Sequence, residues 1–246
     1  GATGRYDTGR ADAAFAPCAQ GQTEPCRFRR QTIGAAMSPQ DFSAQFNVSR
    51  ETMQQLVTYQ ALLGKWQQKI NLVGPATLEQ FWTRHVADSA QLLGLAKADQ
   101  LVWLDLGSGG GFPGLVLAMM LQPRGGYVHL VESDERKVAF LRTVIRETGA
   151  PAEVHLSRIE TLAMDQPEAL VGVQVITARA LAALPKLLPW VAPFFTSSTI
   201  ALLHKGRGWQ EELTEAEQSW KLQAEIIQSV TDEAARIIKV SQLAQL

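Results

Sequence analysis

A glycine-rich segment directly after a short apolar stretch constrains the fold of this chain more than any other feature. Residues 101–106 are apolar enough for a buried strand, and residues 105–114 then carry both D-x-G-x-G-x-G and an overlapping G-x-G-x-x-G. Glycines let the backbone adopt positive φ and approach a ligand closely, and Pro113 suits the start of a helix. The pattern predicts a strand, a ligand-binding loop and a helix, with the loop at the carboxyl edge of a sheet.

Two cofactors compete for such a loop, and one acidic residue separates them. A dinucleotide carries a pyrophosphate, which favours the N-terminus of a helix, whereas S-adenosylmethionine carries an ammonium, a sulfonium and no phosphate. Asp105, directly before the glycines, suits the ammonium and would repel a pyrophosphate. Glu132 ends the next apolar stretch, where an acid suits the ribose hydroxyls of either cofactor. The residues therefore favour S-adenosylmethionine, and NAD remains the alternative.

Apolar stretches and helical patterns alternate through the rest of the chain. Strands are expected at residues 101–106, 127–131, 153–156, 173–178, 199–204, 224–230 and 235–240. Helices are expected from the glycine loop to residue 121 and at 135–148 and 208–220, with a short helix or loop at 185–194. Alternation of this kind predicts a parallel sheet, and the short loop before the last strand predicts a hairpin.

The expected fold class is therefore α/β. The chain should form a Rossmann-like class I S-adenosylmethionine-dependent methyltransferase fold, with a mostly parallel seven-stranded sheet and a C-terminal antiparallel hairpin. Residues 99–246 are the expected S-adenosylmethionine-binding methyltransferase domain. Residues 37–98 show apolar residues at helical spacing, with Ser38 and Ser49 as helix caps, and are the expected N-terminal helical subdomain.

Residues 1–36 differ from the rest of the chain. They hold few large aliphatic residues and show no strand or helix period, and Met37 reads like a natural start. We therefore expect a flexible or non-native leader. Its five arginines against three acidic residues leave open a second interpretation, a basic arm that touches RNA.

Composition excludes several classes of protein. With 46% hydrophobic residues and a net charge of −1, the chain is an ordinary globular one, not a generally basic nucleic-acid binder. No apolar run reaches the roughly 18–20 residues of a membrane span, so no membrane partner is expected. Cys18 and Cys26 make a poor zinc pattern and the four histidines form no H-x3-H or H-E-x-x-H pair, so no metal site is expected. The lack of a signal-peptide pattern makes the cytoplasm the expected location.

Several short motifs, taken in order, carry a family resemblance. They are Asn71-Leu72-Val73, Arg84-His85, Asp88-Ser89, the glycine segment 105–114, Arg136-Lys137, Phe140-Leu141-Arg142, residues 157–160, Ala178-Arg179-Ala180 and Lys205-Gly206. In this combination the chain resembles the ribosomal RNA small subunit methyltransferase G family, also called glucose-inhibited division protein B. Two positions depart from the family pattern: Gly110 stands where many relatives have proline, and Thr177-Ala178-Arg179 replaces a commoner serine-arginine form.

The resemblance implies an activity, a partner and a set of binding residues. The activity is methylation of N7 of one guanine in 16S rRNA near the decoding site, with S-adenosylmethionine as cofactor. The partner is 16S rRNA, within the small ribosomal subunit or an assembly intermediate. The sequence leaves the oligomeric state open, and we favour a monomer. The family's cofactor contacts fall on Gly107, Phe112, Ile159, Glu160 and Arg179. Our interpretation of the loop and of the second strand end adds Ser108, Gly109 and Glu132 to these cofactor-binding residues.

The chemistry of guanine N7 determines what such a site needs. This nitrogen carries a lone pair and no proton, so it can attack the sulfonium methyl group in line, and positioning supplies most of the catalysis. We therefore assign no catalytic acid or base. The N/D-P-P-Y motif of amine methylation is missing after the fourth strand, which disfavours an adenine-N6 enzyme.

Basic residues near the expected strand ends are candidates for RNA contacts. They are Arg84, His85, Arg142, Arg158 and Lys205. Phosphate contacts would position the RNA, whereas the structural alternatives are a solvated helix face for the arginines and a histidine satisfied within the helical subdomain for His85. Two other functions stay open, a methyltransferase that acts on a small molecule or a protein and an NAD-dependent oxidoreductase.

Overall fold

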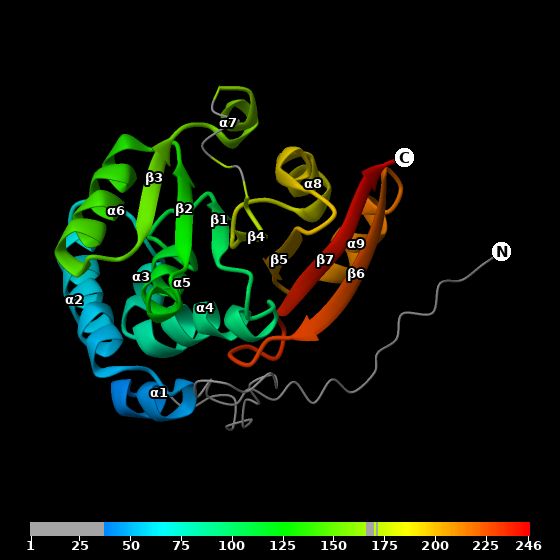
Figure 1. Ribbon diagram of the computed structural model, residues 1–246. Coiled ribbons are helices and arrows are strands. Elements are labelled where there is room, and N and C mark those ends of the chain that lie inside the picture. Colours follow the sequence, from blue (N-terminus) through cyan, green and yellow to red (C-terminus); the bar gives the residue numbers. More distant parts are fainter. Residues whose placement is uncertain (1–36, 166–169, 171) are drawn as a thin grey trace.

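A seven-stranded sheet runs through the centre of the molecule, with helices on both of its faces (Figure 1). The computed structural model describes residues 37–165, 170 and 172–246. The leader expected at residues 1–36 lies outside the described residues. No helix in the described part of the chain is long and apolar enough to cross a membrane.

The sheet has the strand order β3-β2-β1-β4-β5-β7-β6. Its strands are β1 (Val102–Leu106), β2 (Tyr127–Glu132), β3 (Ala152–Leu156), β4 (Val175–Ala178), β5 (Ile200–Lys205), β6 (Trp220–Gln228) and β7 (Arg236–Gln245). Strands β1 to β5 pair in parallel, and β7 runs antiparallel between β5 and β6. The α/β fold class is confirmed. Strand order reverses between β1 and β4, and this is where open α/β sheets bind ligands.

The helices fall between the strands and before them. They are α1 (Pro39–Phe46), α2 (Arg50–Gln67), α3 (Pro75–Leu78), the π-helix η1 (Phe81–Ala87), α4 (Asp88–Ala90), the 3₁₀ turn η2 (Gln91–Gly94), α5 (Gly114–Leu121), the 3₁₀ turn η3 (Gln122–Arg124), α6 (Glu135–Thr148), α7 (Ile159–Asp165), α8 (Leu184–Val191), the 3₁₀ turn η5 (Ala192–Phe194) and α9 (Trp209–Ala216). Ser38 and Ser49 cap α1 and α2 as predicted, each accepting a backbone N–H.

Two apolar cores lie on opposite faces of the sheet. One joins α2, α4, α5 and α6 to sheet residues that include Trp103 and Leu130. The other joins α7, α8 and α9 to Leu104 and Leu106. Neighbouring side chains in a strand point to opposite faces, which explains why successive residues of β1 belong to different cores. The helices between residues 39 and 94 thus share a core with the sheet.

The C-terminal region differs from the sequence expectation. Trp220, expected to end a helix, instead begins β6 and pairs with Gln245 of β7, while α9 ends at Ala216. Polar and apolar residues alternate along 221–226, which is the strand signal. The hairpin is therefore longer than expected, and its outer strand forms one edge of the sheet. The short helix α7 was not expected.

Candidate functional site: two adjoining cavities

The carboxyl ends of β1, β2 and β4 surround a cavity of about 570 Å³, which we call the first cavity. A volume of this size is typical of small-molecule sites. All eight residues expected to bind the cofactor line it. They come from the loop after β1, the end of β2, the start of α7 and the loop after β4. The fold therefore brings together residues that are as much as 72 positions apart in the sequence.

The loop between β1 and α5 presents main-chain groups to the first cavity. Gly107 and Gly109 have φ of 67° and 54°, in the left-handed region that favours glycine. Tyr59 of α2 is fully buried beside this loop. Its hydroxyl donates to the carbonyl of Gly110, and its ring stacks on Phe112 with centroids 5.1 Å apart. Tyr59, a residue of the N-terminal helices, thus fixes the loop without lining the first cavity itself.

Glu132 organises the opposite wall of the first cavity. Its Oε2 accepts from the backbone N–H of Gly109 at 2.8 Å. Its Oε1 accepts from the N–H groups of Ser133 and Asp134 at 2.8 and 2.9 Å. An ionised carboxylate offers about four acceptor positions, so capacity remains for a hydroxyl donor. This acceptor set fits the hydroxyls of a ribose.

Asp105 has a different role from the one that the sequence suggested. Its side chain is 1% exposed and is not among the residues that line the first cavity. Its carboxylate oxygens accept from the hydroxyl of Thr177 at 2.8 Å and from the N–H of Gly114 at 3.2 Å. Burial raises the pKa of Asp105 to about 6, against the lowering effect of these hydrogen bonds. Asp105 therefore ties the loop to β4 and α5, and the expected contact with an ammonium is replaced by internal bonds.

Arg179 links the first cavity to the helices above it. Its Nη2 donates to Nδ1 of His85 at 3.2 Å, and Nε2 of His85 lies 3.0 Å from the hydroxyl of Thr77. Burial first, and Arg179 second, lower the pKa of His85 to about 4. The neutral ring also stacks on Phe112 with centroids 4.6 Å apart. His85 therefore positions Arg179 and Phe112, and both of its ring nitrogens are engaged.

A second cavity, of about 420 Å³, adjoins the first. Three consecutive residues, Arg179, Ala180 and Leu181, line both cavities. Ala180 has φ of 52°, which is uncommon for a residue with a side chain. Strained backbone of this kind clusters at functional sites. The segment after β4 is thus the shared wall of two polar cavities.

Asp88 is the centre of the polar network at the second cavity. Its Oδ1 accepts from the hydroxyl of Thr231 at 2.6 Å and from Nε2 of Gln91 at 2.8 Å. Its Oδ2 lies 3.3 Å from Nη1 of Arg179 and 3.6 Å from Nε2 of His204. Burial by itself would raise the pKa of Asp88, but the neighbouring His204 and Arg179 hold it below its usual value. The carboxylate is therefore ionised at neutral pH.

Two of the candidate RNA contacts line the second cavity and carry ion pairs. Arg84 lies 2.8 Å from Asp232, and Lys205 lies 2.8 Å from Glu212. Only 5% of the Lys205 side chain is exposed, and its Nζ also donates to the carbonyl of Ala182. These two cations therefore shape a cavity more than they offer a free basic surface.

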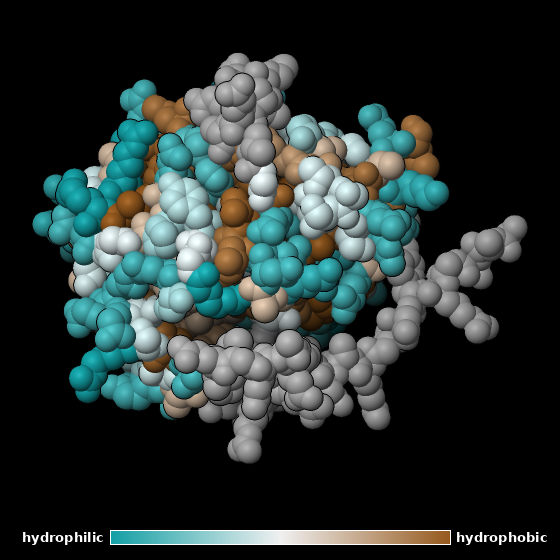
Figure 2. Space-filling view, in the orientation of Figure 1, coloured by the Kyte–Doolittle hydropathy of each residue, from teal (hydrophilic) through white to brown (hydrophobic). Residues whose placement is uncertain are grey.

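The other three candidates lie elsewhere. His85 is buried, lines the first cavity and accepts from Arg179. Arg142 on α6 and Arg158 before α7 have exposed side chains, and Arg158 also lines the first cavity. The molecular face in Figure 2 is mostly hydrophilic, with apolar side chains showing between polar ones near its centre. Exposed cations on such a surface are available to a charged partner.

Residue-by-residue sequence reasoning missed three participants in the site. Tyr59 carries no local signal, because its role depends on how α2 packs against the glycine loop. Asp88 and His204 are 116 positions apart and meet only in the fold. The pair Asp88-Ser89 belonged to the family resemblance, which was the one available sign for that residue. Distant polar partners of this kind leave no periodic pattern in a sequence.

Comparisons with known proteins agree with this architecture. The family model described as "GidB: rRNA small subunit methyltransferase G" matches residues 52–238. Ribosomal RNA small subunit methyltransferase G of Parvibaculum lavamentivorans is 50% identical over 205 residues, covering 83% of this chain and 89% of the relative. The protein of the same name from Rhodospirillum centenum is 48% identical over 204 residues, covering 83% and 90%.

Solved structures of low sequence identity share the fold. A SAM-dependent methyltransferase from Aquifex aeolicus is 15% identical with a TM-score of 0.50, covering 74% of this chain and 97% of that one. A putative O-methyltransferase from Klebsiella pneumoniae is 12% identical with a TM-score of 0.52, covering 76% and 89%. The sheet is therefore that of S-adenosylmethionine-dependent methyltransferases, and the chain belongs to the rRNA small subunit methyltransferase G family.

Proposed function

We propose that this protein, an S-adenosylmethionine-dependent rRNA methyltransferase, methylates N7 of a guanine in 16S rRNA near the decoding site. The names of the relatives support the rRNA substrate. The observation that carries the finer proposal is the pair of adjoining cavities that share the wall at Arg179–Leu181. One cavity suits the methyl donor, and the other suits a nucleobase brought next to it.

The first cavity fits S-adenosylmethionine through the acceptor Glu132 and the main chain of the glycine loop. Glu132 accepts from the ribose hydroxyls, while the loop at Gly107, Ser108 and Gly109 approaches the amino-acid part through main-chain groups. Phe112, Ile159 and Glu160 complete the walls, and Arg179 closes the side toward the second cavity. When bound, S-adenosylmethionine supplies a methyl group on a positively charged sulfur.

Two residues that line the second cavity carry buried polar atoms that lack a hydrogen-bond partner. Among the described residues, the buried side-chain polar atoms that lack a hydrogen-bond partner are Gln45 Oε1, Arg179 Nη1 and His204 Nδ1. Two of these three belong to residues that line the second cavity. Buried polar groups are normally satisfied; Arg179 Nη1 is still 3.3 Å from the Asp88 carboxylate, which leaves His204 Nδ1 as the atom that a guanine would satisfy in this proposal.

The charges of the second cavity suit the reaction at N7. The purine gains positive charge as its N7 takes the methyl group, and the ionised carboxylates of Asp88 and Asp232 line this cavity. Asp88 is paired with Arg179 and Asp232 with Arg84, and such preorganised carboxylates can stabilise positive charge that develops beside them. N7 carries no proton to remove, and His85 is neutral with both ring nitrogens engaged. The residues therefore bind and align the reactants, and none needs to act as a base.

Exposed arginines supply the phosphate contacts in this proposal. We expect Arg142→Ala to weaken binding of 16S rRNA and to lower its salt dependence by about one unit of slope. Cofactor affinity should stay unchanged, because Arg142 does not line the first cavity. Arg146→Ala is the matched control, since Arg146 lies on the same helix and is paired with Glu147 at 3.0 Å. Equal salt slopes for the two variants would contradict the role of Arg142.

The deciding experiment measures N7-methylguanine in 16S rRNA from cells with and without this protein. The purified protein is then given labelled S-adenosylmethionine and, separately, small ribosomal subunits, assembly intermediates, naked 16S rRNA, protein and small-molecule extracts. The proposal expects one labelled guanine near the decoding site. Label in a protein or a metabolite alone would instead establish a methyltransferase that acts on a small molecule or a protein. Thermal stabilisation by NAD and none by S-adenosylmethionine would establish an oxidoreductase.

A further inference from the structure

Two neighbouring strands at one edge of the sheet bring a histidine pair and a glutamate together. His129 of β2 is directly opposite Glu153 of β3, and His155 follows two residues further along β3. Side chains directly opposite in a sheet, and those two apart in a strand, share a face. All three side chains therefore lie on the same face, away from the glycine loop and outside the two cavities.

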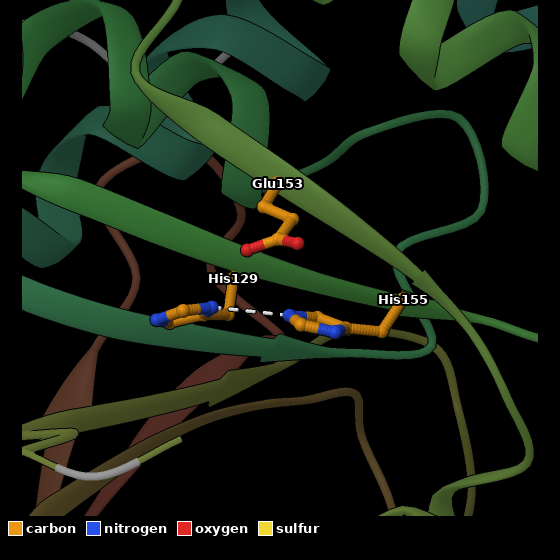
Figure 3. Close-up of side chains that lie close together, drawn as sticks. All are labelled: His129, Glu153 and His155. Atoms are coloured by element: carbon orange, nitrogen blue, oxygen red, sulfur yellow. Dashed lines mark hydrogen bonds between the residues drawn. The ribbon is translucent and has the colours of Figure 1, made fainter. Parts of the chain in front are cut away.

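The three side chains point at one another (Figure 3). Nδ1 of His129 lies 3.0 Å from Nε2 of His155, and both rings are buried at 8% and 6% exposure. Glu153 is exposed, and its side chain reaches toward the histidine pair in Figure 3. One ligand atom from each residue falls within 4.8 Å of the other two. No other group of this kind is found among the described residues.

We propose that His129, His155 and Glu153 bind one Zn²⁺ ion that joins β2 to β3. Zinc prefers imidazole nitrogen and carboxylate oxygen, at about 2.0–2.2 Å, and the His₂Glu set occurs in zinc proteins. Two nitrogens that lie 3.0 Å apart and each about 2.05 Å from one ion subtend an angle of roughly 94° at it. Small shifts of the rings open this angle toward the tetrahedral value, and the exposed side leaves a position for water.

The hydrogen bond between the two histidines does not prevent binding. A neutral pair shares one ring proton between the facing nitrogens, and each ring has a second nitrogen that can carry a proton instead. Binding therefore moves that proton to the far nitrogen of its own ring, and neither histidine has to release a proton. A site built from cysteines would release protons, because thiols bind zinc as thiolates. The number of protons released on zinc binding therefore distinguishes binding at the histidine pair from binding at Cys18 and Cys26, which lie outside the described residues.

Zinc sulfate titrated into the full chain tests the proposal. We expect one ion per chain at pH 7.5, a higher melting temperature with zinc, and a dependence of the heats on the ionisation enthalpy of the buffer that corresponds to at most the one proton of a zinc-bound water. Glu153→Gln and His155→Gln should each weaken zinc affinity at least about tenfold. Glu153 is exposed, so its variant keeps the fold, and circular dichroism without zinc checks this for both.

Two control variants complete the test. Glu225→Gln changes another exposed strand glutamate, which is 3.7 Å from Lys239 and far from the cluster, and should bind zinc as the unchanged protein does. The double variant Cys18→Ser, Cys26→Ser should do the same. The proposal is overturned if the unchanged protein binds no zinc, if Glu153→Gln and His155→Gln bind it normally, or if the cysteine variant abolishes binding.

Discussion

The two cavities are built in different ways although they share a wall. The first takes its shape from one continuous glycine segment and from main-chain groups that Glu132 holds in place. The second is assembled from charged side chains of segments far apart in the chain, with Asp88, Arg179 and His204 at its centre. A cavity built on main chain is sensitive to added atoms, whereas one built on paired charges is sensitive to the loss of a partner.

The largest effect is expected where the second cavity loses a charge. Arg179→Ala removes the cation beside the buried carboxylate of Asp88 and the donor to His85. Breaking a buried pair from one side costs about 3–5 kcal/mol, so urea unfolding should show a loss of about 3 kcal/mol. Cofactor affinity and activity should fall together, because Arg179 lines both cavities.

An exposed ion pair provides the control for this variant. Arg146→Ala removes one partner of the exposed pair with Glu147 and should change stability by less than about 1 kcal/mol. Equal stability of the two arginine variants would show that the network around Asp88 does not depend on its charges. Full cofactor affinity in Arg179→Ala would show that Arg179 does not bind the cofactor.

Acid should destabilise the folded protein through His85, which binds Arg179 in the wall that the two cavities share. Its pKa is about 4 in the folded protein, against 6.5 for an ordinary histidine, so the unfolded chain binds the proton more readily. The free energy of unfolding should fall as pH drops from 6.5 to 4, by about 3 kcal/mol in all, at 1.36 kcal/mol per pKa unit. His85→Gln should lack this loss when unfolding is measured across that range.

The comparison of the unchanged protein with His85→Gln isolates His85 from a second buried group. The pKa of Asp105 is raised to about 6, so its contribution to stability is lost as pH rises from 3.8 to 6, opposite in sign to that of His85. Both proteins keep Asp105, and the difference between their curves reports His85 alone. Parallel curves would mean that His85 is accessible to protons in the folded state.

A smaller effect is expected from one added methyl group at the first cavity. A Cβ at Gly107, which lines the first cavity, would lie 2.5 Å from Cδ1 of Leu181, and its φ of 67° is one that residues with a side chain rarely adopt. Gly107→Ala should destabilise the protein by about 2 kcal/mol, as overpacking does, and should weaken cofactor binding. Gly206→Ala is the control at the second cavity, where a Cβ meets nothing within 4 Å. Equal losses of stability and of cofactor affinity in both variants would show that the two cavities do not differ in their sensitivity to added atoms.

The smallest effect concerns the hydroxyl that holds the glycine loop. Tyr59→Phe removes the hydrogen bond to the Gly110 carbonyl and keeps the stacked ring. The free energy of unfolding should fall by about 1 kcal/mol, the value of one net hydrogen bond, with weaker cofactor binding in calorimetry. Tyr127→Phe, on a ring that is 37% exposed, should change neither quantity. No difference between the two would show that the loop does not need Tyr59.

The sequence by itself determined the fold class and the first cavity. Strand and helix periods, glycines that permit positive φ and the acid at the end of a strand are local properties, and Gly107, Gly109 and Glu132 therefore appear in the structure where the pattern placed them. Helix ends such as Ser38 and Ser49 are local in the same way. The end of α9 at Ala216 differs from the expected helix end at residue 220, because the alternation that begins β6 follows the helix without a break signal.

Only the tertiary structure decided the partners of the polar side chains. It turned Asp105 inward to Thr177, gathered Asp88, Arg179 and His204 at a second cavity, and paired the cations Arg84 and Lys205. It also set His129 against Glu153 and His155, which no spacing rule for metal ligands had indicated, although E-x-H in an expected strand does place both side chains on one face. The physical reason is that these contacts depend on strand register and helix packing, which join residues that the linear sequence keeps far apart.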